Sequence, residues 1–328
     1  MAQRRSSDAK DSRTARSVVR VLAGGAPVSR ADDRPADGLR VRAGAGAGKA
    51  DASVIRTRRW DPPAGTPVRA RGVYLLHGFG EHGARYERLA VRLAADGYRV
   101  AAHDHPGHGE SGGPRGVADP PDALAREAAV RVTRFAEESG AAPYVFGHSL
   151  GGVIALELSL AREVPLAGLM LSAPAIVPRL SRADTIRLRV LSAFAPTYAV
   201  ERPYDASRLT HDPEQIAAAH ADPLIHGFKS AGLVGWLIDN ARRVLDAAPR
   251  LEVKTLLLVA GDDLLIDIAR TQAFAERAPE GLVTLVHYEG YYHELLNETP
   301  ERRERVEDDI LGWLTEREAE VGGATSTG

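Results

Sequence analysis

The segment VFGHSLGGVIALEL places Ser149 between a strand-like apolar run and a helix-like one. Its centre, Gly147-His148-Ser149-Leu150-Gly151, has the spacing G-x-S-x-G, in which a serine on a sharp turn exposes its hydroxyl. Side chains two positions either side of the serine would collide with the crossing backbone, and glycine avoids those collisions. The pattern therefore predicts a nucleophilic serine.

A serine nucleophile needs a base that accepts its proton and an acid that orients the base. In a sheet of this kind the order along the chain is serine, acid, histidine, each on a loop after a strand. His293 follows the apolar run ending at 288 and is preferred over His287, which lies within that run. Asp262, Asp263 and Asp267 all follow the preceding run, so the residues alone leave three candidates for the acid.

Acyl transfer also needs hydrogen-bond donors for the oxyanion that develops in the transition state. The backbone N–H of Leu150, at the start of the helix after the serine, is one expected donor. The second is expected from Phe79, next to the His77-Gly78 pair that ends an early strand. Both groups are main-chain donors, so the prediction depends on loop position rather than on side-chain type.

Three histidines in the segment HDHPGHGES invite a different chemistry, because His103, His105 and His108 lie within six positions with Asp104 among them. Histidine is the commonest metal ligand among side chains, and such a run is compatible with a zinc hydrolase. A di-zinc motif would require an aspartate where Gly107 stands, and it would leave the serine motif without a role. We therefore expect no metal and interpret the loop as a wall of the site, with Asp104 and His108 as hydrogen-bonding members.

The elements that position these residues alternate between strands and helices along the chain. Strands are expected within 53–60, 72–78, 98–105, 143–148, 167–174, 254–261 and 281–288, and helices within 83–97, 122–138, 150–162, 268–277 and 300–316. Strands that are apolar on both faces and joined by helices predict an α/β fold with a mainly parallel sheet covered by helices on each side.

The same pattern predicts the domain organisation. Residues 51–173 and 251–318 form the α/β core, and residues 174–250, with little strand character, form an inserted helical cap. Residues 1–50 contain 11 basic and 5 acidic residues and are expected to be a flexible extension, with a transit peptide or a contact with an anionic membrane as alternatives. Residues 319–328 are expected to be a flexible tail.

Composition narrows the class of protein. The chain has 328 residues, a net charge of −2 and no cysteine, so we expect no nucleic-acid partner and no disulfide or thiol nucleophile. Its apolar runs are shorter than the ~20 residues of a membrane-spanning helix. No secretory signal is recognisable, and the expected location is cytoplasmic.

With these residues assigned, the chain resembles the α/β-hydrolase superfamily, in particular its monoacylglycerol lipase and lysophospholipase-like branch. The resemblance covers residues 53–316. Its motifs are LLHGFGEHGARY, DHPGHGESGGPRG, FGHSLGG, LSAPA, LTHDPEQIAAAHADPLIHG, LLLVAGDDLLID and EGYYHELLNE. It implies Ser149, Asp263 and His293 as the catalytic triad, Phe79 and Leu150 as oxyanion donors, and no cofactor. Asp263 is favoured because the acid of the family precedes an apolar pair and a second acidic residue.

The resemblance further implies an ester of a single acyl chain as substrate, with the cap over the pocket and in contact with lipid. The cap offers apolar residues that would suit an acyl chain or merely pack the cap onto the core: Leu188, Val190, Leu191, Phe194, Leu233, Trp236, Leu237 and Ile238. Alternatives on the same scaffold are a general carboxylesterase, a thioesterase and an aminopeptidase. The opposing class is a non-catalytic binding protein, which predicts a degraded triad.

Overall fold

The computed structural model describes the backbone of residues 19–22, 54–176 and 181–325, and the side chains of residues 54–176 and 181–320. At its centre is a sheet of strands in the order β1-β10-β9-β6-β5-β3-β4-β2. These strands are β1 (Val19–Leu22), β2 (Thr57–Trp60), β3 (Val73–Leu76), β4 (Val100–His103), β5 (Tyr144–His148), β6 (Gly168–Ser172), β9 (Thr255–Ala260) and β10 (Val283–Tyr288). Neighbouring strands run parallel except β2, which pairs antiparallel with β4.

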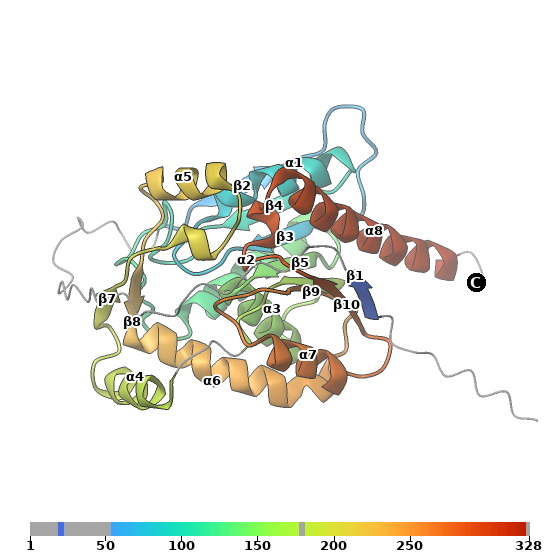
Figure 1. The fold of residues 1–328 in the computed structure, drawn as a ribbon. Helices are drawn as coiled ribbons and strands as arrows, with labels where there is room; N and C mark the ends of the chain where they lie inside the picture. Colours follow the sequence, from blue (N-terminus) through green and yellow to red (C-terminus); the bar gives the residue numbers. More distant parts are fainter. Residues whose placement is uncertain (1–18, 23–53, 177–180, 326–328) are drawn as a thin grey trace, which may run out of the picture.

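Helices cover both faces of the sheet (Figure 1). The core helices are α1 (Glu87–Ala95), α2 (Ala123–Ser139), α3 (Leu150–Ala161), α7 (Ile268–Arg277) and α8 (Pro300–Thr325). Short 3-10 turns are η1 (Gly83–Tyr86), η2 (Ala206–Arg208), η3 (Ala248–Arg250) and η4 (Leu295–Asn297). The predicted mainly parallel sheet between two helical layers is therefore confirmed.

The strand sequences explain why the sheet is covered on both sides. In β3 all four residues are buried, and successive side chains point to opposite faces. Tyr74 and Leu76 belong to a core that includes residues of α2, α3 and α7. Val73 and Leu75 belong to the core on the other face, with residues of α1 and α8. Continuous apolar strands thus require two separate helical layers.

Between β6 and β9 lies the segment that we call the cap segment, residues 174–250. It contains α4 (Arg182–Phe194), β7 (Ala199–Glu201), α5 (Pro213–Ala221), β8 (Phe228–Ser230) and α6 (Ala231–Ala247). Side-chain caps start its helices, because Ser181, Asp212 and Ser230 accept backbone N–H groups of the first turns. The expectation of helices alone missed the antiparallel pair β7–β8.

Two predictions about the ends of the chain need correction. Val19–Leu22, expected to be part of a flexible extension, forms β1 and pairs in parallel with β10. The rest of residues 1–50 lies outside the described residues. The tail expected from 319 is helical to Thr325, where α8 ends. Within the described part of the chain, no helix has both the length and the apolar character to cross a membrane.

Candidate active site

Ser149 occupies a strained turn between β5 and α3. Its φ of 50° is in the left-handed region, which non-glycine residues rarely adopt. A Cβ atom at Gly147 would lie 2.4 Å from the carbonyl oxygen of Gly151, and one at Gly151 would lie 2.2 Å from that of Leu76. The steric requirement predicted for the two glycines is confirmed, and the turn presents Ser149 at the carboxyl edge of the sheet.

Asp263 and His293 are hydrogen-bonded at the same edge, on the loops after β9 and β10. The distance from His293 Nδ1 to Asp263 Oδ2 is 2.7 Å, and each residue is 3% exposed. The other carboxylate oxygen accepts the backbone N–H groups of Leu265 and Ile266. Asp263 is thus fixed both by its histidine partner and by its own loop.

The electrostatics of this pair favour its charged form. Burial opposes ionisation of Asp263, but the charge and hydrogen bond of His293 outweigh it and lower the pKa of the carboxyl. Burial also opposes protonation of His293, and Asp263 outweighs it, so the pKa of the imidazole is raised. An imidazolium ion formed at His293 would therefore be stabilised.

The other two acid candidates lie differently. Asp262 is exposed, and its backbone N–H donates to the carbonyl oxygen of Tyr291, which ties the acid loop to the histidine loop. Asp267 precedes α7 and forms a long ion pair of 3.7 Å with Arg270. Of the three, Asp263 is the residue that hydrogen-bonds His293.

His148 connects the serine turn to this pair. Its ring centroid lies 4.8 Å from that of His293, and its Nδ1 lies 3.1 Å from the carbonyl oxygen of Ser172. Because Ser149 follows His148 directly, the turn and the base are neighbours. His287 lies within β10, 3.7 Å from Glu289, so its placement agrees with the preference for His293.

The two predicted oxyanion donors lie on adjoining backbones. Leu150 is the first residue of α3, whose N-terminal N–H groups have no partner within the helix. Phe79 lies on the loop after β3, and a Cβ at Gly151 would also lie 2.7 Å from the carbonyl oxygen of His77. The start of α3 and the end of β3 are thus in contact at the backbone level.

Comparison with known proteins assigns this chain to a family. The family described as "Serine aminopeptidase, S33" matches residues 68–300. Human monoglyceride lipase is 33% identical over 84% of this chain and 91% of its own length. The monoacylglycerol lipase of Mycolicibacterium smegmatis is 34% identical over 74% of this chain and 88% of its own length. The crystal structure of Paleococcus ferrophilus monoacylglycerol lipase, 29% identical, matches with a TM-score of 0.73 over 80% of this chain and 99% of that chain.

The chain belongs to the serine aminopeptidase S33 family of α/β-hydrolases. The resemblance to monoacylglycerol lipases seen in the motifs is confirmed, as is the α/β-hydrolase fold. The family description names a peptidase whereas these relatives are named lipases, so the family name alone does not specify the bond that is cleaved.

In this α/β-hydrolase three histidines at the ends of β3 and β4, His77, His103 and His105, form a buried hydrogen-bonded stack. One set of tautomers satisfies it: Tyr74 donates to His103, His103 to the ring of His105, and His105 Nε2 to the carbonyl oxygen of His77. The backbone N–H of His105 donates to His77 Nε2, at 2.8 Å. His77 Nδ1 donates to the carbonyl oxygen of Gly78, so both ring nitrogens of His77, His103 and His105 have hydrogen-bond partners at the start of the loop after β3.

Asp104 and His108 both form hydrogen bonds, as predicted for members of this loop, and those of Asp104 also reach other segments. Asp104 accepts bonds from Arg58 and from the backbone N–H groups of Gly83 and Glu110, and His108 donates to the carbonyl oxygen of Pro106. Within the described residues, no three His, Asp or Glu side chains are arranged to hold a metal ion.

Sequence reasoning missed a second set of buried polar residues in this α/β-hydrolase. Glu81, Arg85 and Glu294 form ion pairs next to His293. The available signals were the charged pair at i, i+4 in GEHGARY and the acid that follows the predicted base. Neither signal predicts that Glu294 contacts the Glu81–Arg85 pair, because Arg85 and Glu294 are 209 positions apart in the sequence.

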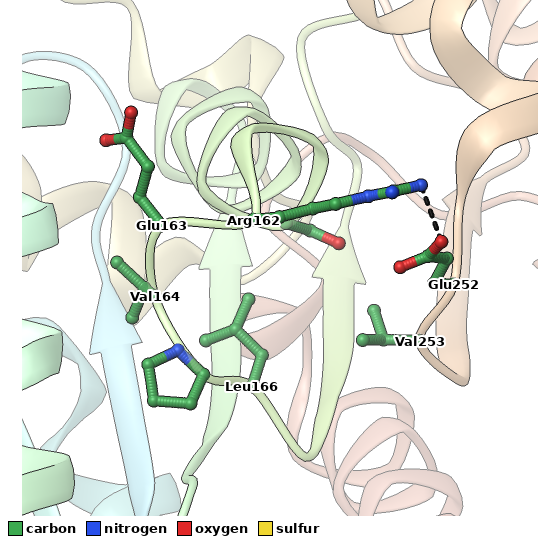
Figure 2. Close-up of a pocket in the computed structure, with 8 residues that line it drawn as sticks. Arg162, Glu163, Val164, Leu166, Glu252 and Val253 are labelled. Carbon is green, nitrogen blue, oxygen red and sulfur yellow. Dashed lines mark ion pairs between the residues drawn. The ribbon is translucent and has the colours of Figure 1, made fainter.

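A surface pocket of about 310 Å³ lies elsewhere (Figure 2). Its wall includes Arg162 and Glu252, which form an ion pair, and Leu166 and Val253, which precede β6 and β9. The pocket is therefore at the amino ends of the strands, whereas Ser149, Asp263 and His293 follow carboxyl ends. In open α/β sheets ligands bind at the carboxyl ends, so this pocket does not belong to the candidate site.

Proposed function

We propose that this protein is a serine hydrolase that cleaves carboxylic esters of a single acyl chain, of the monoacylglycerol lipase or lysophospholipase type. The observation that carries the proposal is the buried Asp263–His293 hydrogen bond beside the strained turn of Ser149. A base fixed by an acid next to a partly exposed serine is the arrangement that activates the hydroxyl as a nucleophile.

The proposed reaction has two steps. The Oγ of Ser149 attacks the ester carbonyl while His293 accepts its proton and Asp263 stabilises the resulting imidazolium. Backbone N–H groups of Phe79 and Leu150 donate to the oxyanion, and His293 then gives the proton to the leaving alcohol. Water, activated by the same histidine, releases the fatty acid from Ser149. His293 accepts or donates the proton in every transfer of this reaction, and no cofactor takes part.

Asp263→Asn is expected to lower kcat by about 10⁴-fold, because the amide holds the imidazole in the wrong tautomer without changing the shape of the site. Initial rates with p-nitrophenyl butyrate measure the effect. Asp262→Asn is the matched control: its side chain is exposed one residue away, and its activity should stay within about twofold of the parent, as for surface substitutions. Equal losses in both variants would contradict the assignment of Asp263.

The names of the relatives and the character of the cap segment support a lipid substrate. Helix α4 has no buried residue, and Ile186 and Phe194 are 64% and 87% exposed. Leu233 and Ile238 of α6, by contrast, are buried in packing. Exposed large apolar side chains on one helix favour contact with a lipid surface. We propose that α4 touches the lipid aggregate from which the substrate enters.

Ile186→Ser combined with Phe194→Ser is therefore expected to weaken binding to phosphatidylcholine vesicles about tenfold or more, since each buried apolar side chain contributes about 1.5–3 kcal/mol. Co-sedimentation measures the binding, and turnover of soluble p-nitrophenyl acetate should remain unchanged. Val130→Ser on α2, which is 60% exposed outside the cap segment, is the control. If the double variant binds vesicles as well as the control does, α4 is not the contact.

Two measurements together test the function. A fluorophosphonate probe should label Ser149, as found by peptide mapping, whereas a non-catalytic binding protein would stay unlabelled. A panel of monoacylglycerols, lysophospholipids, acyl-CoA thioesters, aminoacyl amides and short p-nitrophenyl esters then assigns the substrate. A steep optimum at long-chain monoacylglycerol or lysophospholipid supports the proposal. Preference for acetate or butyrate esters favours a general carboxylesterase, and preference for thioesters or amides favours a thioesterase or an aminopeptidase.

A further inference from the structure

Three charged side chains form a buried ion-pair cluster beside the candidate site. Arg85 bonds both oxygens of Glu294, with distances of 2.9 Å and 2.7 Å, and its Nη1 lies 2.8 Å from Glu81 Oε2. Glu81 is 2% exposed and Glu294 is 5% exposed. A bidentate guanidinium pair has a defined geometry that a point charge does not impose. The cluster therefore fixes the relative positions of the two carboxylates.

Glu81 connects the cluster to residues 77–80 after β3, which we call the oxyanion loop because they include the proposed donor Phe79. Its Oε1 accepts the backbone N–H of Gly78 at 2.6 Å and the hydroxyl of Tyr86 at 2.7 Å. Gly78 directly precedes Phe79, whose N–H is the proposed oxyanion donor. The carboxylate thus sets the peptide orientation one residue before that donor.

Glu294 connects the cluster to the loop of the proposed base, because it directly follows His293. Asn297 donates to its Oε2 at 2.9 Å. Two bonds reach the cap segment: the hydroxyl of Tyr204 donates to Glu294 Oε1 at 2.7 Å, and the backbone N–H of Glu294 donates to the carbonyl oxygen of Leu209 at 2.8 Å. The same carboxylate therefore holds the base loop, the cap segment and Arg85.

The cluster is also unbalanced in charge, since it has two carboxylates and one guanidinium. The groups that face His293 are Asp263, Glu294, Glu81 and the ring of His148. Burial lowers the pKa of His293, Asp263 raises it most, and Glu294 and then Glu81 raise it further. The excess negative charge thus acts in the same direction as the triad acid.

We propose that Glu81, Arg85 and Glu294 form a positioning unit that holds the oxyanion loop and the base loop in register and supplies negative charge that stabilises the imidazolium of His293. The inference rests on the proposed function, in that His293 is taken as the base. It assigns a role in catalysis to three residues that do not touch the reacting atoms. The bidentate pair of Arg85 and Glu294 fixes the geometry of the two loops. The negative charge that Arg85 leaves unbalanced stabilises the imidazolium of His293.

Glu294→Gln tests the charge. Glutamine keeps the volume and one acceptor oxygen but removes the excess negative charge, so the pKa of His293 should fall. Because the base must be neutral, the acid limb of the kcat/KM profile should move to lower pH by about half a pH unit. At pH 8, kcat with p-nitrophenyl butyrate should fall about tenfold, with KM changed less than about twofold. A purely structural residue would not move the acid limb.

Arg85→Lys tests the geometry, because lysine keeps the charge but cannot bond Glu81 and both oxygens of Glu294 with a planar fork. Its kcat should fall about tenfold while the acid limb stays in place. Glu307→Gln is the matched control, since Glu307 is also a buried carboxylate, 2% exposed, paired with Arg88 and Arg92. It should lose comparable stability and keep both kcat and the acid limb.

Titration of the His293 ring by NMR in a Ser149→Ala background reads the charge effect without turnover. Glu294→Gln should lower the pKa of His293 there, and an unchanged value overturns the proposal, as does full kcat in Arg85→Lys. Failure of the proposed function has a different signature: Ser149→Ala would retain turnover whatever the titration shows.

Discussion

Ser149→Ala is expected to abolish turnover of p-nitrophenyl esters, with kcat lowered about 10⁵- to 10⁶-fold. The methyl group cannot form the acyl-enzyme, and the oxyanion donors alone leave only a small residual acceleration over water. The measurement is a single-turnover and steady-state assay with p-nitrophenyl butyrate. In the parent protein an acyl-enzyme burst is expected, and in the variant it should be absent.

The variant should remain folded, which makes the loss interpretable. Ser149 is only partly buried, and alanine keeps its Cβ in the same strained turn, so the free energy of unfolding should change by less than about 1 kcal/mol. Ser159→Ala, on the helix α3 that follows Ser149, is the control for a serine-to-alanine change away from the turn. Substantial turnover by a folded Ser149→Ala variant would remove Ser149 from the mechanism and with it the proposed function.

The site residues that could be predicted from the sequence are those that directly follow a strand. Ser149, Asp263 and His293 each follow a buried apolar run, and parallel strands bring their carboxyl ends to one edge of the sheet. Their order along the chain and the two glycines beside Ser149 complete the pattern. The choice among Asp262, Asp263 and Asp267 came from the family motif, and the structure separates them by burial: Asp263 is enclosed and Asp262 is exposed.

The cluster of Glu81, Arg85 and Glu294 was not predictable in this way. A glutamate and an arginine four residues apart are typical of a solvated helix face. Burial of Glu81 and Arg85 depends on segments more than a hundred positions away. Arg85 donates to the hydroxyl of Tyr204, 119 positions along the chain, and to the carboxylate of Glu294, 209 positions along the chain. Tertiary enclosure, and not local pattern, decides whether such charges are buried.

Similar reasons explain the errors in the fold. The short pair β7–β8 has only three residues in each strand, too few for an alternating pattern to be recognised. Val19–Leu22 has the sequence VRVL and lies inside a basic, glycine-rich segment, so the composition of that segment did not indicate a strand. This strand pairs with β10. Near the end of the chain, the Glu and Arg residues between 316 and 320 favour helix on propensity alone, although among the described side chains of α8 none beyond Leu314 is buried.

Lowering the pH from 7 to 5 is expected to destabilise the folded protein by several kcal/mol, because of the histidine stack and its neighbour His108. Burial is the main cause that lowers the pKa of His103 to about 3 and that of His108 to about 4. A histidine of the unfolded chain has a pKa near ~6.5. Between these values the unfolded chain binds protons that the folded protein does not, so stability falls with falling pH. Each histidine contributes about 2 kcal/mol over this interval, measured by urea unfolding at both pH values.

His293 acts in the opposite sense, since its pKa is raised. Its contribution to stability is complete below the pKa of the unfolded chain and is lost as the pH rises through the pKa of the folded protein.

His108→Asn isolates the contribution of one histidine to the loss of stability in acid, because an amide can still donate to the carbonyl oxygen of Pro106 but does not titrate. The difference in unfolding free energy between pH 7 and pH 5 should then shrink by about 2 kcal/mol, whereas replacement of the exposed His220 by Asn should leave it unchanged. If His108→Asn loses as much stability on acidification as the parent, the folded protein already protonates that ring near pH 6, and burial does not keep His108 neutral.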